Sequence, residues 1–133
     1  MADSIPFYRP GQDVTGRASA AVEGRRFVMI SGNRYGGPAL STDVTGNNIR
    51  IAHATAAGRI FGVAAQSAAQ GGYTNVYRGA GYIVEVDAAS DIDAFEEVEV
   101  GANGKATALD AGVAVGYAIT GVANNGVAQI ALY

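Results

Sequence analysis

The sequence contains no cysteine and no tryptophan, only three prolines, and a single histidine in 133 residues. Without cysteine the chain cannot form disulfides, thiolate zinc sites or a cysteine nucleophile, and it is compatible with folding in a reducing cytoplasm. Histidine is the side chain most often used for acid–base catalysis near neutral pH. We therefore predict that the protein is not an enzyme and needs no cofactor and no metal.

Positive charge is also scarce, and it is spread along the chain. The net charge is -3, and the nine Lys and Arg residues stand apart except for the pair Arg25 and Arg26. Nucleic-acid binders usually show a basic patch, and a membrane helix needs about 20 consecutive apolar residues. The opening MADSIPFYRPGQ lacks the charged and apolar regions of a secretory signal. We predict neither nucleic acid nor a membrane as a partner.

Glycine, by contrast, is abundant. The 19 glycines amount to about twice the usual share of ~7% and show no three-residue period. They fall between short apolar stretches, as turns do in small β-proteins. A chain of this length fits one domain, which can bury roughly two-thirds of its unfolded surface.

The apolar residues between these turns alternate with polar ones. Segment 81–88 places Tyr82, Val84, Val86 and Ala88 on one face, which predicts a half-buried strand. Segment 96–100 places Val98 and Val100 opposite Glu97 and Glu99, which we expect on a solvated face. Asn103-Gly104 and the NNG at 124–126 predict hairpin turns that lead into strands at 105–109 and 127–132, the latter paired with 115–120. Further strands are expected at 13–19, 26–31, 48–52, 59–65 and 73–78.

About ten short strands predict an all-β fold, a single-domain β-barrel or β-sandwich (β-tulip-like) over 13–133 with little helix. Segments 64–70 and 87–95 could each form a helical turn, the second capped by Ser90 with Asp93. No domain boundary and no fixed-period repeat is expected. Residues 31–48 form a long polar loop of the kind that is often functional.

Residues 1–12 are predicted to form an extended N-terminal arm. Pro6 and Pro10 fix their own φ and favour extended geometry in the residue before each of them. Phe7 and Tyr8 lie between them, and two aromatic side chains on an extended arm should pack against the domain or against a neighbour.

Four kinds of chemical site compete with ordinary structural roles for these residues. His53 shares a face with Ile49 and Ile51, so a structural or surface role outweighs a catalytic or metal-binding one. The acidic residues between 87 and 99 do not match the calcium-loop spacing, and the glycine pairs match neither phosphate-loop motif. Tyr35, Tyr73, Tyr77, Tyr82 and Tyr117 could form a sugar-binding face or an ordinary subunit interface.

The order of several motifs resembles the capsid cement (head decoration) proteins of tailed bacteriophages. The motifs are RPGQDVT (9–15), AVEGRRFVMI (21–30), RIFGVAAQSAAQGG (59–72), GYIVEV (81–86), NGKATA (103–108) and VGYAITGVANNGVAQIALY (115–133). The chain departs from the pattern at Phe95-Glu96, where a Gly-Asp is expected, and in its long 31–48 loop.

The resemblance implies a virion structural protein that binds the outer surface of an assembled head and stabilises junctions between capsomers. It implies the major capsid protein as partner, a homotrimer on the capsid, and synthesis in the host cytoplasm. The predicted contact residues lie on the arm and in the long loop: Phe7, Tyr8, Arg9, Pro10, Arg34 and Tyr35. The alternative is a carbohydrate- or surface-binding adhesion module of a virion or cell.

Overall fold

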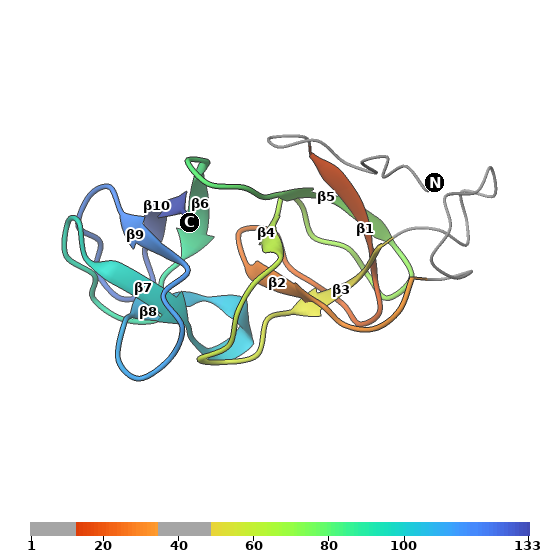
Figure 1. Ribbon diagram of the computed structural model, residues 1–133, viewed down its shortest axis with the longest axis horizontal. Coiled ribbons are helices and arrows are strands. Elements are labelled where there is room, and N and C mark those ends of the chain that lie inside the picture. The colour runs from red at the N-terminus through yellow and green to blue at the C-terminus, as the bar shows by residue number, and fades with distance from the viewer. Residues whose placement is uncertain (1–12, 35–48) are drawn as a thin grey trace, which may run out of the picture.

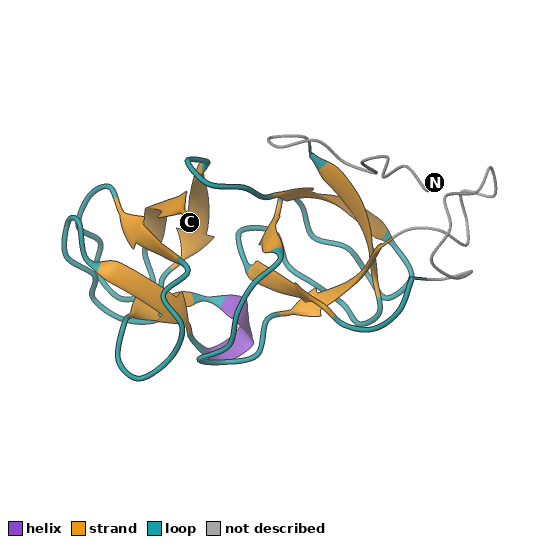
Figure 2. Ribbon diagram, in the orientation of Figure 1, coloured by secondary structure: helices purple, strands orange, loops and turns teal. Residues whose placement is uncertain are grey.

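The computed structural model describes residues 13–34 and 49–133, and these residues form ten strands and one short 3-10 turn, η1 (Ala102–Gly104) (Figures 1 and 2). Among them, no helix has the length and apolar character needed to cross a membrane. The strands are β1 (Val14–Ala18), β2 (Phe27–Ile30), β3 (Ile49–His53), β4 (Gly62–Ala64), β5 (Tyr73–Tyr77), β6 (Ile83–Asp87), β7 (Glu97–Val100), β8 (Ala106–Ala108), β9 (Gly116–Ala118) and β10 (Val127–Leu132).

The first five strands close into a barrel in the order β1-β3-β2-β4-β5. β1 closes it, because it pairs in parallel with β3 and antiparallel with β5. Within the barrel, Val14, Val28, Ile51 and Val76 belong to one buried cluster. The two-residue alternation of apolar side chains therefore fills the inside of a closed sheet, as the predicted barrel requires.

The last five strands form a second sheet in the order β6-β10-β9-β7-β8. An isolated parallel bridge between Ala88 and Ala106 brings β8 back to the end of β6. The amide of Ala89 also donates to the Ala106 carbonyl at 2.7 Å. The second sheet thus curls toward closure in the strand order of the first, and we call the two units the first and second barrels (Figure 1).

The two barrels repeat the same hydrogen bonds. Val22 and Ala68 exchange two backbone bonds of 2.9 Å in the first barrel, and Ile92 with Val122 does the same in the second. The left-handed residue before β2, Arg25 (φ 61°), corresponds to Phe95 (φ 67°) before β7. The chain is therefore a tandem pair of like units.

No fixed-period repeat was expected from the sequence, yet the structure contains two like units with the same strand order. Identical residues are few and small, for example Gly62 with Gly116, Ala64 with Ala118 and Gly72 with Gly126. The spacing also changes between the halves, because the β2–β3 connection is much longer than the β7–β8 connection. The strand order and backbone hydrogen bonds are thus repeated, although few residues are identical.

The predicted strands are confirmed, since each predicted segment overlaps one strand, and only β3 extends beyond its segment, by one residue. Val84 and Val86 are buried while Ile83 is 58% exposed, as the alternation indicated. The Asn103-Gly104 turn joins the antiparallel β7 and β8 with both residues at positive φ. β9 pairs with β10, but the 124–126 turn lies inside a longer connection that also bonds Ile92.

Two local expectations were wrong. Segments 64–70 and 87–95 contain no helix, because their residues form isolated bridges instead: Ala68 with Val22 in the first segment, and Ala88 with Ala106 and Ile92 with Val122 in the second. Ser90 does not cap a helix, and its hydroxyl instead accepts the Ala108 amide at 3.1 Å. Glu99 is only 8% exposed rather than solvated, because its Oε2 accepts the Gly112 amide at 2.6 Å.

The barrels meet through a shared apolar core. Phe27 and Val63 of the first barrel belong to the same buried cluster as Val84, Val86 and Val100 of the second. Phe27 is fully buried there. Truncating a buried Phe typically costs about 3–5 kcal/mol, so this side chain contributes substantially to stability at the junction.

Polar contacts fix the orientation of the two barrels around that core. Asp87 at the end of β6 pairs with Arg26 Nε at 3.0 Å and with Arg25 Nε at 3.3 Å. The Arg26 guanidinium also donates to the Asn103 carbonyl at 3.0 Å. The amide of Ala57 donates to the Val100 carbonyl at 2.8 Å. Apolar burial and directional bonds therefore act at the same junction.

Two equivalent glycines generate a stability prediction. A Cβ at Gly62 would collide with the Tyr77 carbonyl oxygen, and one at Gly116 with the Ala131 carbonyl oxygen. Each of G62A and G116A should lower the free energy of unfolding by about 1–3 kcal/mol, the usual cost of overpacking. Urea denaturation measures it. The control is G121A, whose Cβ meets nothing closer than 3.6 Å, and a loss there equal to that of G116A would contradict the steric account.

Candidate partner-binding surfaces

Most of the contact residues predicted from the sequence lie outside the described residues. Phe7, Tyr8, Arg9 and Pro10 of the arm and Tyr35 of the long loop belong to this group. Arg34 is described and is partly buried just after β2. The predicted contact role of all six residues therefore stays a prediction.

His53 at the end of β3 has a structural hydrogen bond. Its Nε2 accepts the backbone amide of Glu23 at 3.0 Å, which requires the neutral ring with the proton on Nδ1. Partial burial lowers the pKa of His53 below its ordinary value of 6.5, and the nearby Arg26 lowers it further, against a smaller opposing effect of Glu23. The ring thus ties the 19–26 connection to β3.

The acidic residues between 87 and 99 are dispersed rather than gathered. Asp87 pairs with the two arginines at the junction, and Asp91 Oδ1 accepts the Asn124 amide at 2.8 Å. Glu96 Oε1 accepts the Asp93 amide at 2.9 Å. Among the described residues no group of three His, Cys, Asp or Glu side chains could hold a metal ion. Asp87, Asp91 and Glu96 thus each have a structural partner.

The tyrosines of the predicted set that lie within residues 49–133 do not share one face. Tyr73 lies beneath the guanidinium of Arg17, with 5.8 Å from the ring centre to Arg17 Cζ. Tyr77 and Tyr82 stack at the junction with ring centres 5.8 Å apart, and Tyr117 lies at the far end of the second barrel. The four members of the predicted set that the structure describes therefore fall in three places, which does not fit a single sugar-binding face.

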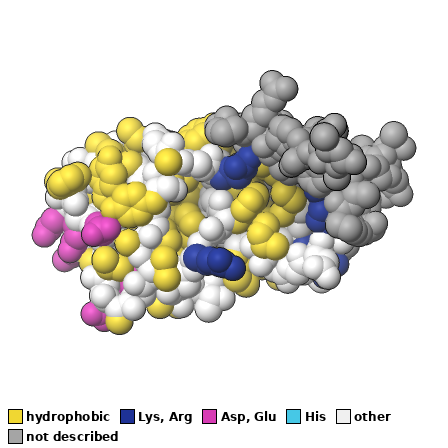
Figure 3. Space-filling model, in the orientation of Figure 1, with side chains coloured by type: hydrophobic (Ala, Val, Ile, Leu, Met, Phe, Trp, Pro, Cys, Tyr) yellow, Lys and Arg dark blue, Asp and Glu magenta, His cyan; other side chains and the backbone are white. Residues whose placement is uncertain are grey.

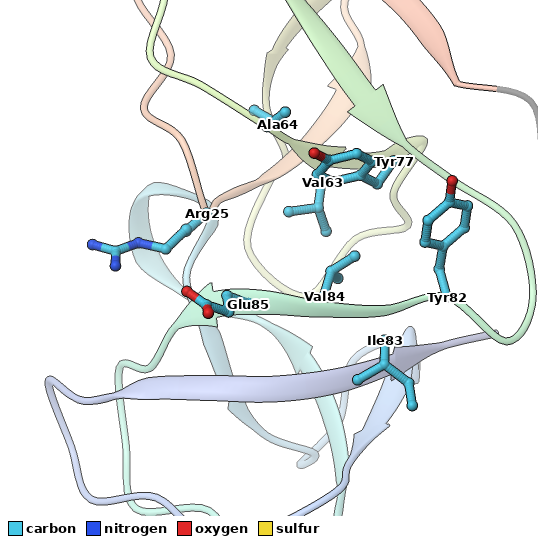
Figure 4. A pocket seen from close by; sticks show the side chains of 9 residues that line it. Arg25, Val63, Ala64, Tyr77, Tyr82, Ile83, Val84 and Glu85 are labelled. Carbon is cyan, nitrogen blue, oxygen red and sulfur yellow. The ribbon is translucent and has the colours of Figure 1, made fainter.

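A groove of about 350 Å³ runs along the junction (Figure 4). Arg25 and Glu85 lie at one end, the rings of Tyr77 and Tyr82 at the other, and Val63 is among the residues between them. The Tyr82 hydroxyl donates to Asp13 Oδ1 at 2.7 Å, and this bond raises the pKa of Tyr82. The described lining thus combines aliphatic and aromatic side chains with the charged Arg25 and Glu85.

The far end of the second barrel presents an exposed aromatic surface, which we call the end face: Phe95, Glu96, Glu97, Tyr117 and Tyr133. Phe95 is 79% exposed, and its ring meets Tyr117 edge to face at 5.3 Å. The Tyr133 ring lies 6.0 Å from Tyr117, and its hydroxyl donates to Glu97 Oε2 at 2.7 Å, which raises the pKa of Tyr133.

Phe95 also has an unusual backbone conformation. Its φ of 67° lies in the left-handed region, which a bulky side chain adopts only where surrounding bonds enforce it. The Phe95 amide donates to the Ala118 carbonyl at 2.8 Å, which supplies such a restraint. A strained backbone that holds a large apolar ring in solvent is typical of a binding surface.

Charge is divided between the two barrels, a feature that the net charge of the whole chain hid. Residues 1–82 contain eight Arg against four Asp or Glu, whereas residues 83–133 contain one Lys against eight Asp or Glu. Figure 3 shows acidic side chains gathered at the second-barrel end and basic ones toward the first. Counting charge separately for each half of the sequence would have revealed this division.

Comparison with solved structures finds a similar protein described as the head fiber gp8.5 N base in bacteriophage phi29, known from its crystal structure. The match has a TM-score of 0.70 and 22% sequence identity, and it covers 92% of this chain and 93% of the other. No protein-family profile and no curated protein sequence matches the chain. At this identity the likeness shows a shared fold over nearly the whole length.

The hydrogen bond of His53 generates a pH prediction. Because the folded-state pKa of His53 lies below 6.5, the unfolded chain binds the proton more tightly, and stability is lost as the pH falls through and below that value. H53Q keeps an acceptor but cannot titrate. Between about pH 7.5 and about pH 5 the wild type should lose more in Tm than H53Q. Parallel decreases in Tm for the two proteins would contradict the structural role.

Proposed function

We propose that the chain is a structural protein of a tailed-phage virion that binds the outer surface of the assembled head. The observation that carries this proposal is the fold it shares with a phage head fiber base over more than nine-tenths of both chains. The ordered motifs from RPGQDVT to the terminal hairpin, which resemble cement proteins, support it independently. The protein would be made in the host cytoplasm and would end on the capsid exterior.

The finer proposal is that the protein cements the capsid lattice. A shell under internal pressure fails where capsomers separate, and a subunit that bridges a junction adds buried area there. The major capsid protein would be the partner, and a homotrimer would engage several capsid sites at once. Linking modest contacts in this way raises the overall affinity by orders of magnitude without new chemistry.

The internal structure of the chain supports a mechanical role. Several acidic side chains of the second barrel form structural bonds, as Glu99 does with Gly112 and Asp87 does with Arg26. His53 likewise serves a backbone amide. Two barrels locked by a common core form a body that can transmit force without rearranging.

Binding to heads provides the first test. Purified protein should co-sediment with undecorated heads of its phage and raise the temperature at which they break. At a free concentration 100-fold above Kd, each occupied site gains about 2.7 kcal/mol. Heads that neither bind the protein nor gain thermal resistance would contradict the proposal, and binding without added resistance would contradict cementing alone.

Deletion of residues 2–10 tests the predicted arm contacts. If Phe7, Tyr8, Arg9 and Pro10 contact the capsid, the truncated protein should bind heads more weakly while its Tm in solution stays close to that of the full chain. The matched control is R59E, a substitution at an exposed site elsewhere on the first barrel. Head binding by the truncated protein equal to that of the full chain would remove the arm from the contact.

A further inference from the structure

We propose that copies of this chain associate head to tail, with the end face of one second barrel docked on the β1 side of the next copy's first barrel. The contact would reproduce the junction that already joins the two barrels within one chain. This inference deepens the trimer of the proposed function and rests on that proposal only for the number of copies.

The starting observation is that Glu97 and Tyr117 of the end face correspond to buried residues of the first barrel, whereas Arg25, the counterpart of Phe95, is half exposed. Phe95 occupies the left-handed position of Arg25, and Glu97 pairs with Tyr117 as Phe27 pairs with Val63. In the first barrel this surface is covered, because Phe27 and Val63 pack into the shared core. Its counterpart on the second barrel remains exposed. The surface around Phe27 and Val63 is therefore covered by the second barrel, whereas the equivalent surface around Glu97 and Tyr117 is not covered.

The ion pair of the junction has a charge-inverted counterpart. The Arg26 carbonyl oxygen accepts the Ala64 amide at 3.0 Å, and the Glu96 carbonyl oxygen accepts the Ala118 amide at 2.9 Å. Glu96 therefore takes the place of Arg26. Asp87 faces Val127 in the sheet as Arg17 faces Tyr73, so Arg17 takes the place of Asp87. The ion pair between Arg26 and Asp87 within one chain therefore corresponds to an ion pair between Glu96 of one copy and Arg17 of the next.

This inversion preserves attraction. Glu96 and Arg17 have opposite charges, and both side chains are partly exposed in the isolated chain. Two like charges at these positions would have forbidden the repeated contact. The Arg17 guanidinium lies over Tyr73 and its Nε donates to the Gly71 carbonyl at 3.3 Å, so it is held at the surface in a defined place.

The residues of the end face suit a surface that is exposed to water in the isolated chain and buried when two copies associate. Phe27, which is permanently covered, corresponds to Glu97, and Val63 corresponds to Tyr117. Tyr and Phe are enriched at protein interfaces, where their rings bury area and the tyrosine hydroxyl remains satisfied. An acidic, aromatic surface remains compatible with an isolated chain, whereas an exposed copy of the aliphatic junction would promote aggregation.

The difference in charge between the two barrels also favours head-to-tail association. The acidic second barrel of one copy would approach the arginine-rich first barrel of the next, which favours head-to-tail encounter over association of like ends. Head-to-tail contacts use two different surfaces, so they build a ring when the rotation closes and a filament when it does not. A ring of three copies is the closed form that agrees with the proposed trimer.

Charge exchange at one pair tests the contact, with the full chain in solution and no heads present. Sedimentation velocity over a concentration series should show self-association of the wild type that weakens at about 1 M salt, where the screening length is about 3 Å. E96R and R17E should each raise the dissociation constant on the order of tenfold or more. The double variant E96R/R17E should regain most of the wild-type affinity.

The matched control is E96R/R59E, which has the same net charge as E96R/R17E but leaves the new arginine facing Arg17; it should not regain affinity. F95A should weaken association without lowering Tm. A wild type that stays monomeric throughout the series, or association unchanged by E96R, would overturn the inference. Because no heads are used, head binding by a monomer would leave the proposed function standing while removing this contact.

Discussion

The contact between the two barrels is the constraint on which the rest of the molecule depends. Phe27 leaves its own barrel to enter the core of the second, and Arg26 with Asp87 fixes the rotation between them. Each barrel alone would expose this surface. The junction therefore holds the two barrels together as one unit. It also determines which surfaces remain exposed and able to bind a partner.

The strand pattern could be predicted from the sequence because its cause is local. Alternating side chains and glycine turns identify the strands one at a time, and the burial of Val84 beside exposed Ile83 follows that rule. The burial of Glu99 could not be predicted, since the Gly112 amide that satisfies it arrives from a distant loop. The repeat also escaped detection, because backbone bonds preserve it more than side chains do.

The candidate surface was harder to predict than the fold. Phe95 looked like a departure from a familiar motif, and only its φ of 67° and its correspondence to Arg25 give that departure a meaning. The division of charge was present in the sequence, but the net charge of -3 averages it away. Equivalence between Glu96 and Arg26 depends on tertiary pairing, which no local pattern records.

Hydrogen exchange measured against protein concentration tests the central claim, that one contact is filled within the chain and open at its end. We expect the amides of β7 and β9 near the end face, and those of β1 around Arg17, to become better protected as the protein concentration rises. The junction amides of Asp87 and Ala57 should stay protected at every concentration. Protection that is independent of concentration at the end face, or a junction that exchanges as fast as the surface, would contradict it.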